Sequence, residues 1–208
     1  MHSFTIQEQV GNTDIYLIDQ IMKGRYRNDD IVLDAGCGIG RNLHWFLLNQ
    51  IPCYGIDLDE QAIHQLKMAR PFLPENQFQI SAVENLPFTN RFFNHVISSA
   101  VLHFAKGHSQ FKKMVSEMIR VLKPGGTLFI RMTSSIGMED AIEFIGDGVF
   151  AIPDGSVRFL LTRALATEII RDYGLILLEP VKTVNVDDIR CMTTLVLQKG
   201  VSNEVPVK

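Results

Sequence analysis

Three glycines and an aspartate follow a short apolar run near the start of the chain. The run Ile31–Leu33 leads into Asp34 and then into glycines spaced by two, Gly36, Gly38 and Gly40. Glycine lets a backbone approach a ligand closely, and a helix that begins after such a loop offers unpaired N–H groups and about half a positive charge. The loop therefore suits a nucleotide-like ligand or a carboxylate, although glycine turns between a strand and a helix also form for purely structural reasons.

A second carboxylate, Asp57, ends the next apolar run, Cys53–Ile56, 21 residues after Gly36. A carboxylate in this place can accept hydrogen bonds from both hydroxyls of an adenosine ribose. Charge-assisted hydrogen bonds of this kind contribute roughly 1.5 to 3 kcal/mol each. The alternative role for Asp57 is to cap the helix that is expected to begin near Glu60.

The glycine spacing separates two cofactor classes, a nicotinamide dinucleotide and S-adenosylmethionine. Dinucleotide enzymes usually carry GxGxxG, whereas the third glycine here comes one residue early. Asp34 at the loop entrance would repel a pyrophosphate, but it can attract an ammonium or sulfonium cation. Both features favour S-adenosylmethionine. A nicotinamide-dependent oxidoreductase stays open as an alternative, although no tyrosine is followed four residues later by the lysine that short-chain dehydrogenases use.

The elements that must position these residues alternate between short apolar runs and longer segments with helical periodicity. The runs that predict strands are Ile31–Leu33, Cys53–Ile56, Phe78–Ile80, His95–Ser98 and Thr127–Ile130. The segments that predict helices between them are Asn42–Gln50, Glu60–Arg70 and Gln110–Leu122. A right-handed series of this kind gives a mostly parallel sheet covered on both faces, a doubly wound, Rossmann-like α/β sandwich of three layers.

This alternation changes after Arg131. Arg158–Asp172 is expected to form a helix, and the apolar runs Leu175–Leu178 and Met192–Leu197 are expected to form two antiparallel strands. A further helix over about Asp14–Tyr26 could cover the mouth of a cleft.

Length and composition predict a single cytoplasmic domain over residues 1–208, of which 46% are hydrophobic. Within it we expect an N-terminal helical segment over about 1–28 and a candidate substrate-facing insertion over about 132–158. No run approaches the roughly 18 consecutive apolar residues of a membrane span, and Met1–Val10 lacks the pattern of a secretory signal. A net charge of -3 with scattered Lys and Arg disfavours nucleic-acid partners and leaves the oligomeric state unknown.

Four segments, in the family's order, resemble class I S-adenosylmethionine-dependent methyltransferases, in the broad small-molecule group called methyltransferase type 11. The segments are VLDAGCGIGRN at Val32–Asn42, YGIDLDE at Tyr54–Glu60, ENLPFTNRFFNHVISSAVLHF at Glu84–Phe104 and VLKPGGTLFI at Val121–Ile130. The resemblance implies a seven-stranded sheet with six parallel strands and an antiparallel last strand. It also implies S-adenosylmethionine as the cofactor, S-adenosylhomocysteine as its product and a small-molecule acceptor.

The same resemblance assigns roles to residues of this chain. The positions that would bind the cofactor are Asp34, Ala35, Gly36, Cys37 and Gly38 for the methionine part, Asp57 for the ribose, Leu58, Ala82 and Val83 for the adenine, and Ser98 beside the methyl donor. Relatives often carry an acid at the position of Ala82 to receive the adenine amino group, so that side-chain contact is missing here. Asn94 replaces an aspartate that is common in the family, which puts the local hydrogen bonding in question.

His103 is the candidate for a general base. Proximity and orientation can supply much of the acceleration of a methyl transfer, but a hydroxyl or a protonated amine acceptor additionally needs a base. In the family, the position of His103 lies on the side of the fourth strand where the methyl group points; the alternative is that it only packs or orders the loop. The other histidines are weaker candidates, and no metal site is predicted from His2, His44, His64, His95, His108 or the three cysteines.

The acceptor is expected to be selected by the insertion over 132–158 and by the N-terminal segment. The insertion mixes acidic and aromatic side chains, Glu139, Asp140, Glu143, Asp147, Phe144 and Phe150. These could form an acidic, aromatic lid for a cationic acceptor, or an ordinary amphipathic helix with Ile142 and Ile145 inward. A protein that binds the cofactor without catalysis is the other open alternative.

Overall fold

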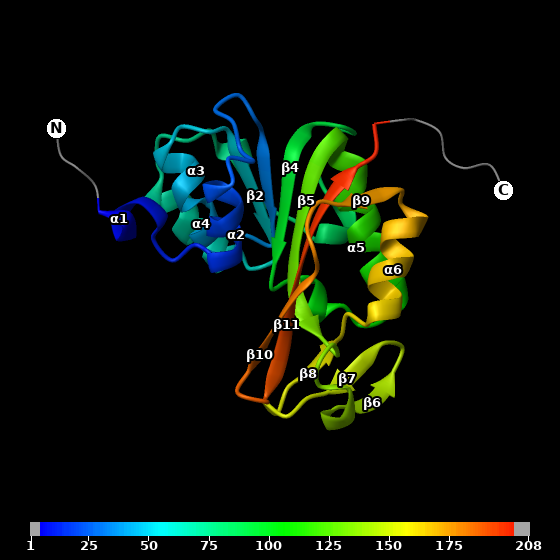
Figure 1. Cartoon of the computed structure of the whole chain (residues 1–208). Helices are drawn as coiled ribbons and strands as arrows, with labels where there is room; N and C mark the ends of the chain where they lie inside the picture. The colour runs from blue at the N-terminus through cyan, green and yellow to red at the C-terminus, as the bar shows by residue number, and fades with distance from the viewer. Residues whose placement is uncertain (1–4, 202–208) are drawn as a thin grey trace.

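The protein is built on one large sheet whose strands follow the order β10-β11-β5-β4-β1-β2-β3 (Figure 1). The computed structural model describes residues 5–201. The strands of this sheet are β1 (Val32–Ala35), β2 (Cys53–Asp57), β3 (Phe78–Ile80), β4 (Phe93–Ser99), β5 (Leu122–Ser134), β9 (Leu175–Leu177), β10 (Lys182–Val186) and β11 (Arg190–Lys199). The first five pair in parallel, so all five strands predicted from the apolar runs are confirmed.

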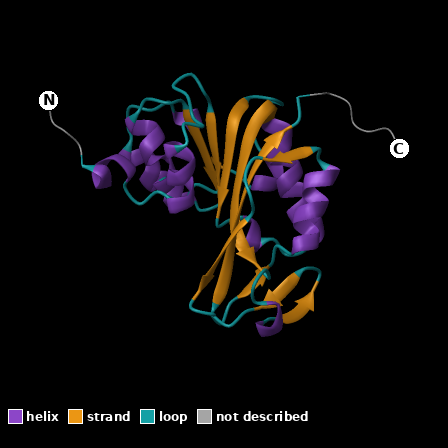
Figure 2. Cartoon of the chain, viewed as in Figure 1, coloured by secondary structure: helices purple, strands orange, loops and turns teal. Residues whose placement is uncertain are grey.

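Helices lie on both faces of the sheet (Figure 2). They are α1 (Ile6–Val10), α2 (Ile15–Met22), α3 (His44–Leu48), α4 (Glu60–Ala69), α5 (His108–Val121) and α6 (Arg163–Asp172). In Figure 1, α2, α3 and α4 lie on one side of the sheet, and α5 and α6 lie on the other. The doubly wound α/β sandwich predicted from the sequence is therefore confirmed.

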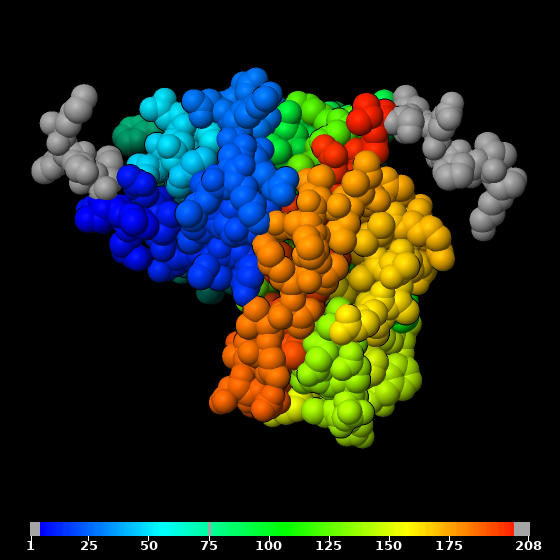
Figure 3. All heavy atoms as spheres, in the orientation of Figure 1, coloured from blue at the N-terminus to red at the C-terminus, as the bar shows by residue number. Residues whose placement is uncertain are grey.

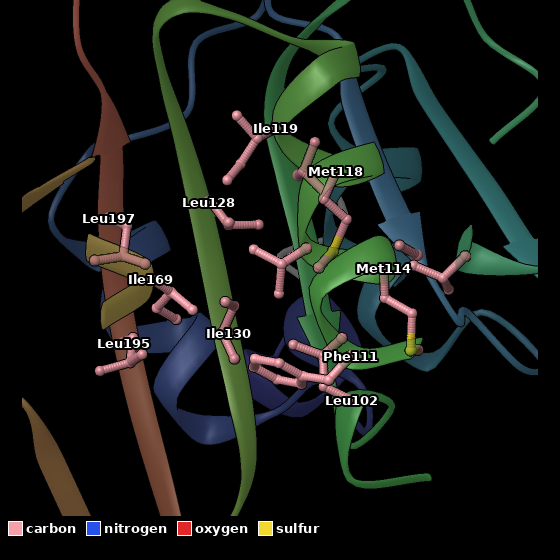
Figure 4. Close-up of a cluster of buried hydrophobic side chains, with 14 of the residues drawn as sticks. Leu102, Phe111, Met114, Met118, Ile119, Leu128, Ile130, Ile169, Leu195 and Leu197 are labelled. Atoms are coloured by element: carbon pink, nitrogen blue, oxygen red, sulfur yellow. The ribbon is translucent and has the colours of Figure 1, made fainter. Parts of the chain in front are cut away.

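Each face of the sheet has its own buried core. On the α5 side, the apolar stripe of the helix packs against strands β5 and β11 (Figure 4); its members include Phe111, Met114, Met118, Ile119, Leu128, Ile130, Leu195 and Leu197. On the other side, the core includes Leu17, Phe46, Leu66, Val32, Ile97 and Phe129. Because successive side chains of a strand point to opposite faces, neighbours such as Phe129 and Ile130 supply the two cores.

The C-terminal part contains one strand more than the sequence predicts. β10 pairs antiparallel with β11, as β5 does on the other side of β11. Six strands of the seven in the main path therefore run one way, and β11, the last in the chain, runs against them, as the resemblance implies. β9 is an additional short strand on β11. β10 carries Lys182, Thr183 and Asn185, so a search for apolar runs does not find it.

The insertion after β5 forms a small antiparallel sheet and not a helix, so the amphipathic-helix interpretation was wrong. Its strands are β6 (Glu143–Gly146), β7 (Val149–Ala151) and β8 (Val157–Phe159). Gly146, Asp147 and Gly148 all have positive φ, at +154°, +48° and +80°, and so turn the chain between β6 and β7. Ile145, which the helix interpretation placed inward, is 56% exposed, and Phe144 beside it is 63% exposed.

Two predicted helices are shorter than the sequence suggests. The helix expected over Arg158–Asp172 begins at Arg163, because β8 takes the preceding residues and Thr162 Oγ1 accepts a hydrogen bond from the N–H of Leu165 at 3.0 Å. The helix expected over Asp14–Tyr26 is α2, and Asp14 caps it by accepting from the N–H of Tyr16 at 3.0 Å. None of the helices in the described part of the chain is long and apolar enough to cross a membrane.

Candidate active site

A cavity of about 620 Å³ lies beside the ends of β1, β2 and β4. In open α/β sheets, ligands bind at this carboxyl edge of the strands. Six of the residues predicted to bind the cofactor line the cavity: Gly36, Cys37, Gly38, Asp57, Leu58 and Val83. The structure thus brings together residues that are separated by up to about 50 positions in the sequence.

Backbone hydrogen bonds attach the glycine loop to β2. The N–H groups of Gly36 and Cys37 donate to the carbonyl of Ile56 at 2.8 and 2.9 Å. Gly36 has a φ of +91°, and a Cβ built on it would collide with the side chain of Val101. Gly38 has a φ of +52°, with open space where a Cβ would be. Glycine is therefore required at the first position by conformation and by space, and at the second it leaves the backbone accessible to a ligand.

Asp57 accepts a hydrogen bond from the glycine loop and also lines the cavity. Its Oδ2 accepts a hydrogen bond from the N–H of Gly38 at 2.7 Å, and its Oδ1 accepts from the N–H of Asp59 at 2.9 Å. The cap of α4 is Asp59, whose Oδ1 accepts from the first turn of the helix. The alternative that Asp57 caps this helix was therefore wrong. A carboxylate has about four acceptor positions, so Asp57 keeps lone pairs for a ligand.

Asp34 lies next to the loop without lining the cavity. It is 1% exposed, and neither carboxyl oxygen has a hydrogen-bond partner within residues 5–201. Burial raises the pKa of this carboxyl to about 8, and the charge of Asp57 adds to the effect. A buried polar group without a partner is costly, and a ligand cation beside Asp34 would reduce that cost. Asp34 thus fits the ammonium end of S-adenosylmethionine.

Three other predicted cofactor residues, Ala35, Ala82 and Ser98, do not line the cavity. Ser98 is completely buried, and its neighbour Ser99 lines the cavity in its place. Side chains alternate along a strand, so the signal that distinguishes these two serines is the face of β4 on which each one lies. Glu84 also lines the cavity, so a carboxylate does reach the wall near Ala82.

The N-terminal segment is connected to the cavity by a polar cluster that the sequence does not reveal. Asp14 Oδ2 accepts hydrogen bonds from Ser99 Oγ and from Arg131 Nη1, both at 3.1 Å, and Arg41 Nη2 lies 3.8 Å away. Arg131 also lies over the ring of Tyr16, 5.2 Å from its centre. The start of α2 is therefore attached to the ends of β4 and β5, beside the cavity.

His103 is buried, at 7% exposure, in the short turn Leu102–Phe104 after β4. Its Nδ1 accepts from the N–H of Thr133 at 3.3 Å, and the hydroxyl of Thr133 lies 3.1 Å from the same atom. The neutral ring therefore carries its proton on Nε2. Burial, followed by the charges of Arg158 and Arg190, lowers the pKa of His103 to about 4. The ring is neutral near pH 7, and its role as a base stays a prediction.

A second cavity of about 340 Å³ adjoins the first, since Ala100 and Phe104 line both. Its other lining residues are His103, Arg131, Thr133, Asp154, Arg158, Val186, Arg190 and Met192. Ala100 has a φ of +64°, a strained conformation for a residue with a side chain, and such strain often marks functional sites. Two neighbouring cavities of this kind can hold a cofactor and an acceptor side by side.

No group of His, Cys, Asp or Glu side chains among the described residues is arranged to hold a metal ion. His44 and His95 are each hydrogen-bonded within the fold, to the carbonyl of Glu8 and to the carboxylate of Asp30. His2 lies outside the described residues.

Comparison with known families agrees with this geometry. Residues 33–130 match a family model described as a methyltransferase domain. Residues 33–130 are therefore similar to a type 11 methyltransferase domain. The matched range contains the glycine loop, Asp57 and the turn that carries His103. The structure is also similar to an S-adenosylmethionine-dependent methyltransferase from Methanosarcina mazei, with a TM-score of 0.73 and 20% identity over 88% of this chain and 98% of the other. At that identity the likeness shows the fold alone.

Two curated relatives are similar to part of this chain. A tRNA (carboxymethyluridine(34)-5-O)-methyltransferase from Arabidopsis thaliana is 37% identical over 48% of this chain and 23% of its own length. A phthiotriol/phenolphthiotriol dimycocerosates methyltransferase from Mycobacterium leprae is 28% identical over 65% of this chain and 50% of its own length. The chain thus spans half or less of the length of these relatives.

Because His103 is buried, we expect the free energy of unfolding of the protein to depend on pH. As the pH falls below 6.5, the unfolded chain binds a proton at His103 that the folded chain, with a pKa of about 4, does not yet accept. His103 should therefore lower the free energy of unfolding by about 2 kcal/mol between pH 7 and pH 5. Urea unfolding at these pH values should show a smaller loss for His103→Asn than for the unmodified chain. Exposed His64→Asn is the control; equal losses in all three proteins would contradict the prediction.

Proposed function

We propose that the protein is an S-adenosylmethionine-dependent methyltransferase that acts on a small-molecule acceptor. The observation that carries this proposal is the connection of the glycine loop to Asp57, through the 2.7 Å hydrogen bond from Gly38, on the wall of the larger cavity. Buried Asp34, without a hydrogen-bond partner among the described residues, gives the site a place for the cation that this cofactor carries. A dinucleotide would instead bring a negatively charged pyrophosphate to this loop.

In this proposal the cofactor supplies an activated methyl group on a positively charged sulfur. Asp57 binds the ribose hydroxyls with the lone pairs that the loop leaves free. Asp34 and the loop Ala35–Gly38 surround the methionine part, and Leu58, Ala82 and Val83 flank the adenine. Ser98 supports the strand end from within the core, and its neighbour Ser99 contacts the ligand side.

The chain's own contribution to the reaction is mainly positioning. Ala100 and Phe104 separate the two cavities, so an acceptor in the smaller one meets the cofactor across this short wall. Holding two reactants in this way supplies a large part of the rate enhancement of a displacement. His103 remains the proposed base. Either its Nδ1 gives up the hydrogen bond with Thr133 and accepts the proton, or the ring proton first moves from Nε2 to Nδ1 so that Nε2 can accept it.

A small-molecule acceptor is favoured over RNA by the size of the smaller cavity, about 340 Å³, and by the net charge of -3. The tRNA relative covers only part of either chain, so its substrate does not decide this point. A specific observation keeps a non-methylating function as the second candidate. The cyclase SpnF has the same fold, with a TM-score of 0.68 at 18% identity, so the fold by itself does not fix the reaction.

The test is a calorimetric titration of the protein with S-adenosylmethionine, S-adenosylhomocysteine and NADH. We expect the first two to bind at one site per chain and NADH not to bind. Binding of NADH alone would instead favour an oxidoreductase. Incubation with methyl-labelled cofactor and a panel of phenols, amines and carboxylic acids then separates a methyltransferase from a protein that only binds the cofactor.

A further inference from the structure

The smaller cavity has more positive than negative side chains. Arg131, Arg158 and Arg190 line it together with a single carboxylate, Asp154. His103, the remaining ionisable group on its wall, is neutral near pH 7 because its pKa is lowered to about 4. Asp14, behind the wall, pairs with Arg131, so Arg158, Arg190 and Asp154 leave an excess of one positive charge in the cavity.

The three arginines differ in how well they are paired. Arg131 is bound to Asp14 at 3.1 Å, but its Nε is buried without a partner among the described residues. Arg190 lies 3.8 Å from Asp154, at the outer limit of an ion pair. Arg158 donates to the carbonyl of Val157 and lies over the ring of Phe104, 4.9 Å from its centre. Within residues 5–201, no carboxylate forms an ion pair with Arg158.

Resting on the proposed methyltransferase function, we propose that the acceptor is a small molecule with an anionic group, a carboxylate or a phosphate, which Arg158 and Arg190 bind in this cavity. The planar guanidinium group of arginine matches the paired oxygens of both anions and can bind them through two parallel hydrogen bonds. An anion here compensates the positive charge that Asp154 alone leaves between Arg158 and Arg190. The neutral His103 ring adds a hydrogen-bonding group without changing that charge.

The chain segments that carry these arginines support the assignment. Asp154 and Arg158 belong to the insertion; Asp154 precedes β8 and Arg158 lies within it. Arg190 is the first residue of β11, which forms a hairpin with β10. Figure 3 shows this hairpin, in orange, beside the yellow-green insertion. The insertion thus lines the smaller cavity, with a charge opposite to that expected from its acidic residues. The acidic residues expected to attract a cationic acceptor, Glu139, Asp140, Glu143 and Asp147, do not line the cavity.

The place of Arg158 relative to the two cavities predicts which end of the acceptor reacts. The guanidinium of Arg158 lies over the ring of Phe104, which lines both cavities. An acceptor whose anionic group binds Arg158 therefore extends past Phe104 and Ala100 toward the cofactor. The anionic group is an anchor at one end, and the atom that receives the methyl group lies at the other.

The experiment begins with S-adenosylhomocysteine, because its binding tests the proposed function separately. If it does not bind, the proposed function fails. With this ligand at saturation, calorimetric titrations then use inorganic phosphate, benzoate and benzylamine as probes. We expect phosphate or benzoate to bind at one site, with a dissociation constant in the millimolar range or tighter, and benzylamine not to bind. The stronger of the two anions distinguishes a phosphate from a carboxylate acceptor.

Three variants locate the bound anion. Arg158→Gln combined with Arg190→Gln should weaken anion binding at least tenfold, whereas Asp154→Asn should strengthen it, an effect that misfolding does not produce. Arg171→Gln, on the exposed side of α6, should leave it unchanged. The proposal is overturned if S-adenosylhomocysteine binds but neither anion does, if the double variant binds the anion as well as the unmodified chain, if benzylamine is preferred, or if only an RNA oligonucleotide binds.

Discussion

Replacing Asp57 with alanine should weaken the binding of S-adenosylhomocysteine by about a hundredfold. The carboxylate is expected to accept hydrogen bonds from both ribose hydroxyls, and two charge-assisted bonds at the low end of their range amount to about 3 kcal/mol, or roughly two factors of ten in affinity. The same substitution removes the acceptor of the Gly38 N–H and so loosens the loop. Calorimetric titration of both proteins measures the difference.

Asp59→Ala is the matched control for this prediction. It removes a carboxylate two residues away that caps α4, so it should lower the free energy of unfolding by about 1 kcal/mol. Binding of S-adenosylhomocysteine should change less than threefold, since Asp59 does not line the cavity. Equal losses of affinity in the two variants would mean that Asp57 acts only through the general stability of this region.

Gly36→Ala should both destabilise the protein and abolish measurable cofactor binding. The backbone of Gly36 has a φ of +91°, and the added Cβ would overlap the side chain of Val101. Backbone strain of about 1 to 2 kcal/mol and overpacking of about 1 to 3 kcal/mol act together on the free energy of unfolding. Denaturant unfolding should therefore show a loss of about 3 kcal/mol.

Two further variants separate strain from overlap at this position. Gly24→Ala introduces a side chain at a φ of +66° with no atom within 4 Å, so it should show the strain alone, about 1 kcal/mol. In the double variant Gly36→Ala with Val101→Ala, the smaller neighbour should restore part of the lost stability. If Gly24→Ala costs as much as Gly36→Ala, the contact with Val101 is irrelevant.

Much of the donor half of the site can be predicted from the sequence because local spacing determines it. The loop after β1 and the aspartate after β2 each follow a recognisable apolar run, and a parallel sheet must bring the ends of adjacent strands together. The same reasoning finds five strands and the buried stripe of α5. The resemblance to known methyltransferases assigns a contact to Ser98 where Ser99 lines the cavity, because the sequence of a strand buried on both faces does not show which side chains point to which face.

The residues of the smaller cavity, which we propose for the acceptor, could not be predicted in this way. Arg131, Arg158 and Arg190 are three isolated cations in the sequence, and they meet only because a three-stranded sheet and the β10–β11 hairpin fold against the end of β5. The acidic residues of the insertion are closer together along the chain and so suggest a cationic acceptor, although none of them lines the smaller cavity. Short strands such as β6 and β7 also resemble a helix in composition until the glycines at their turn are considered.

The walls of the two cavities come from different segments of the chain. This separation affects which residues can be substituted while cofactor binding is kept. The donor side depends on the ends of β1 and β2 and on the loop Gly36–Gly40, which strand pairing, positive φ and close contacts constrain. Arg190 is the first residue of β11, beside the turn from β10, and Arg158 lies in the short strand β8 of the small sheet. Positions beside exposed turns tolerate substitution better than the middle of core strands does. Selection, or an engineer, can therefore change these two positions to obtain a new acceptor while the donor chemistry is inherited intact.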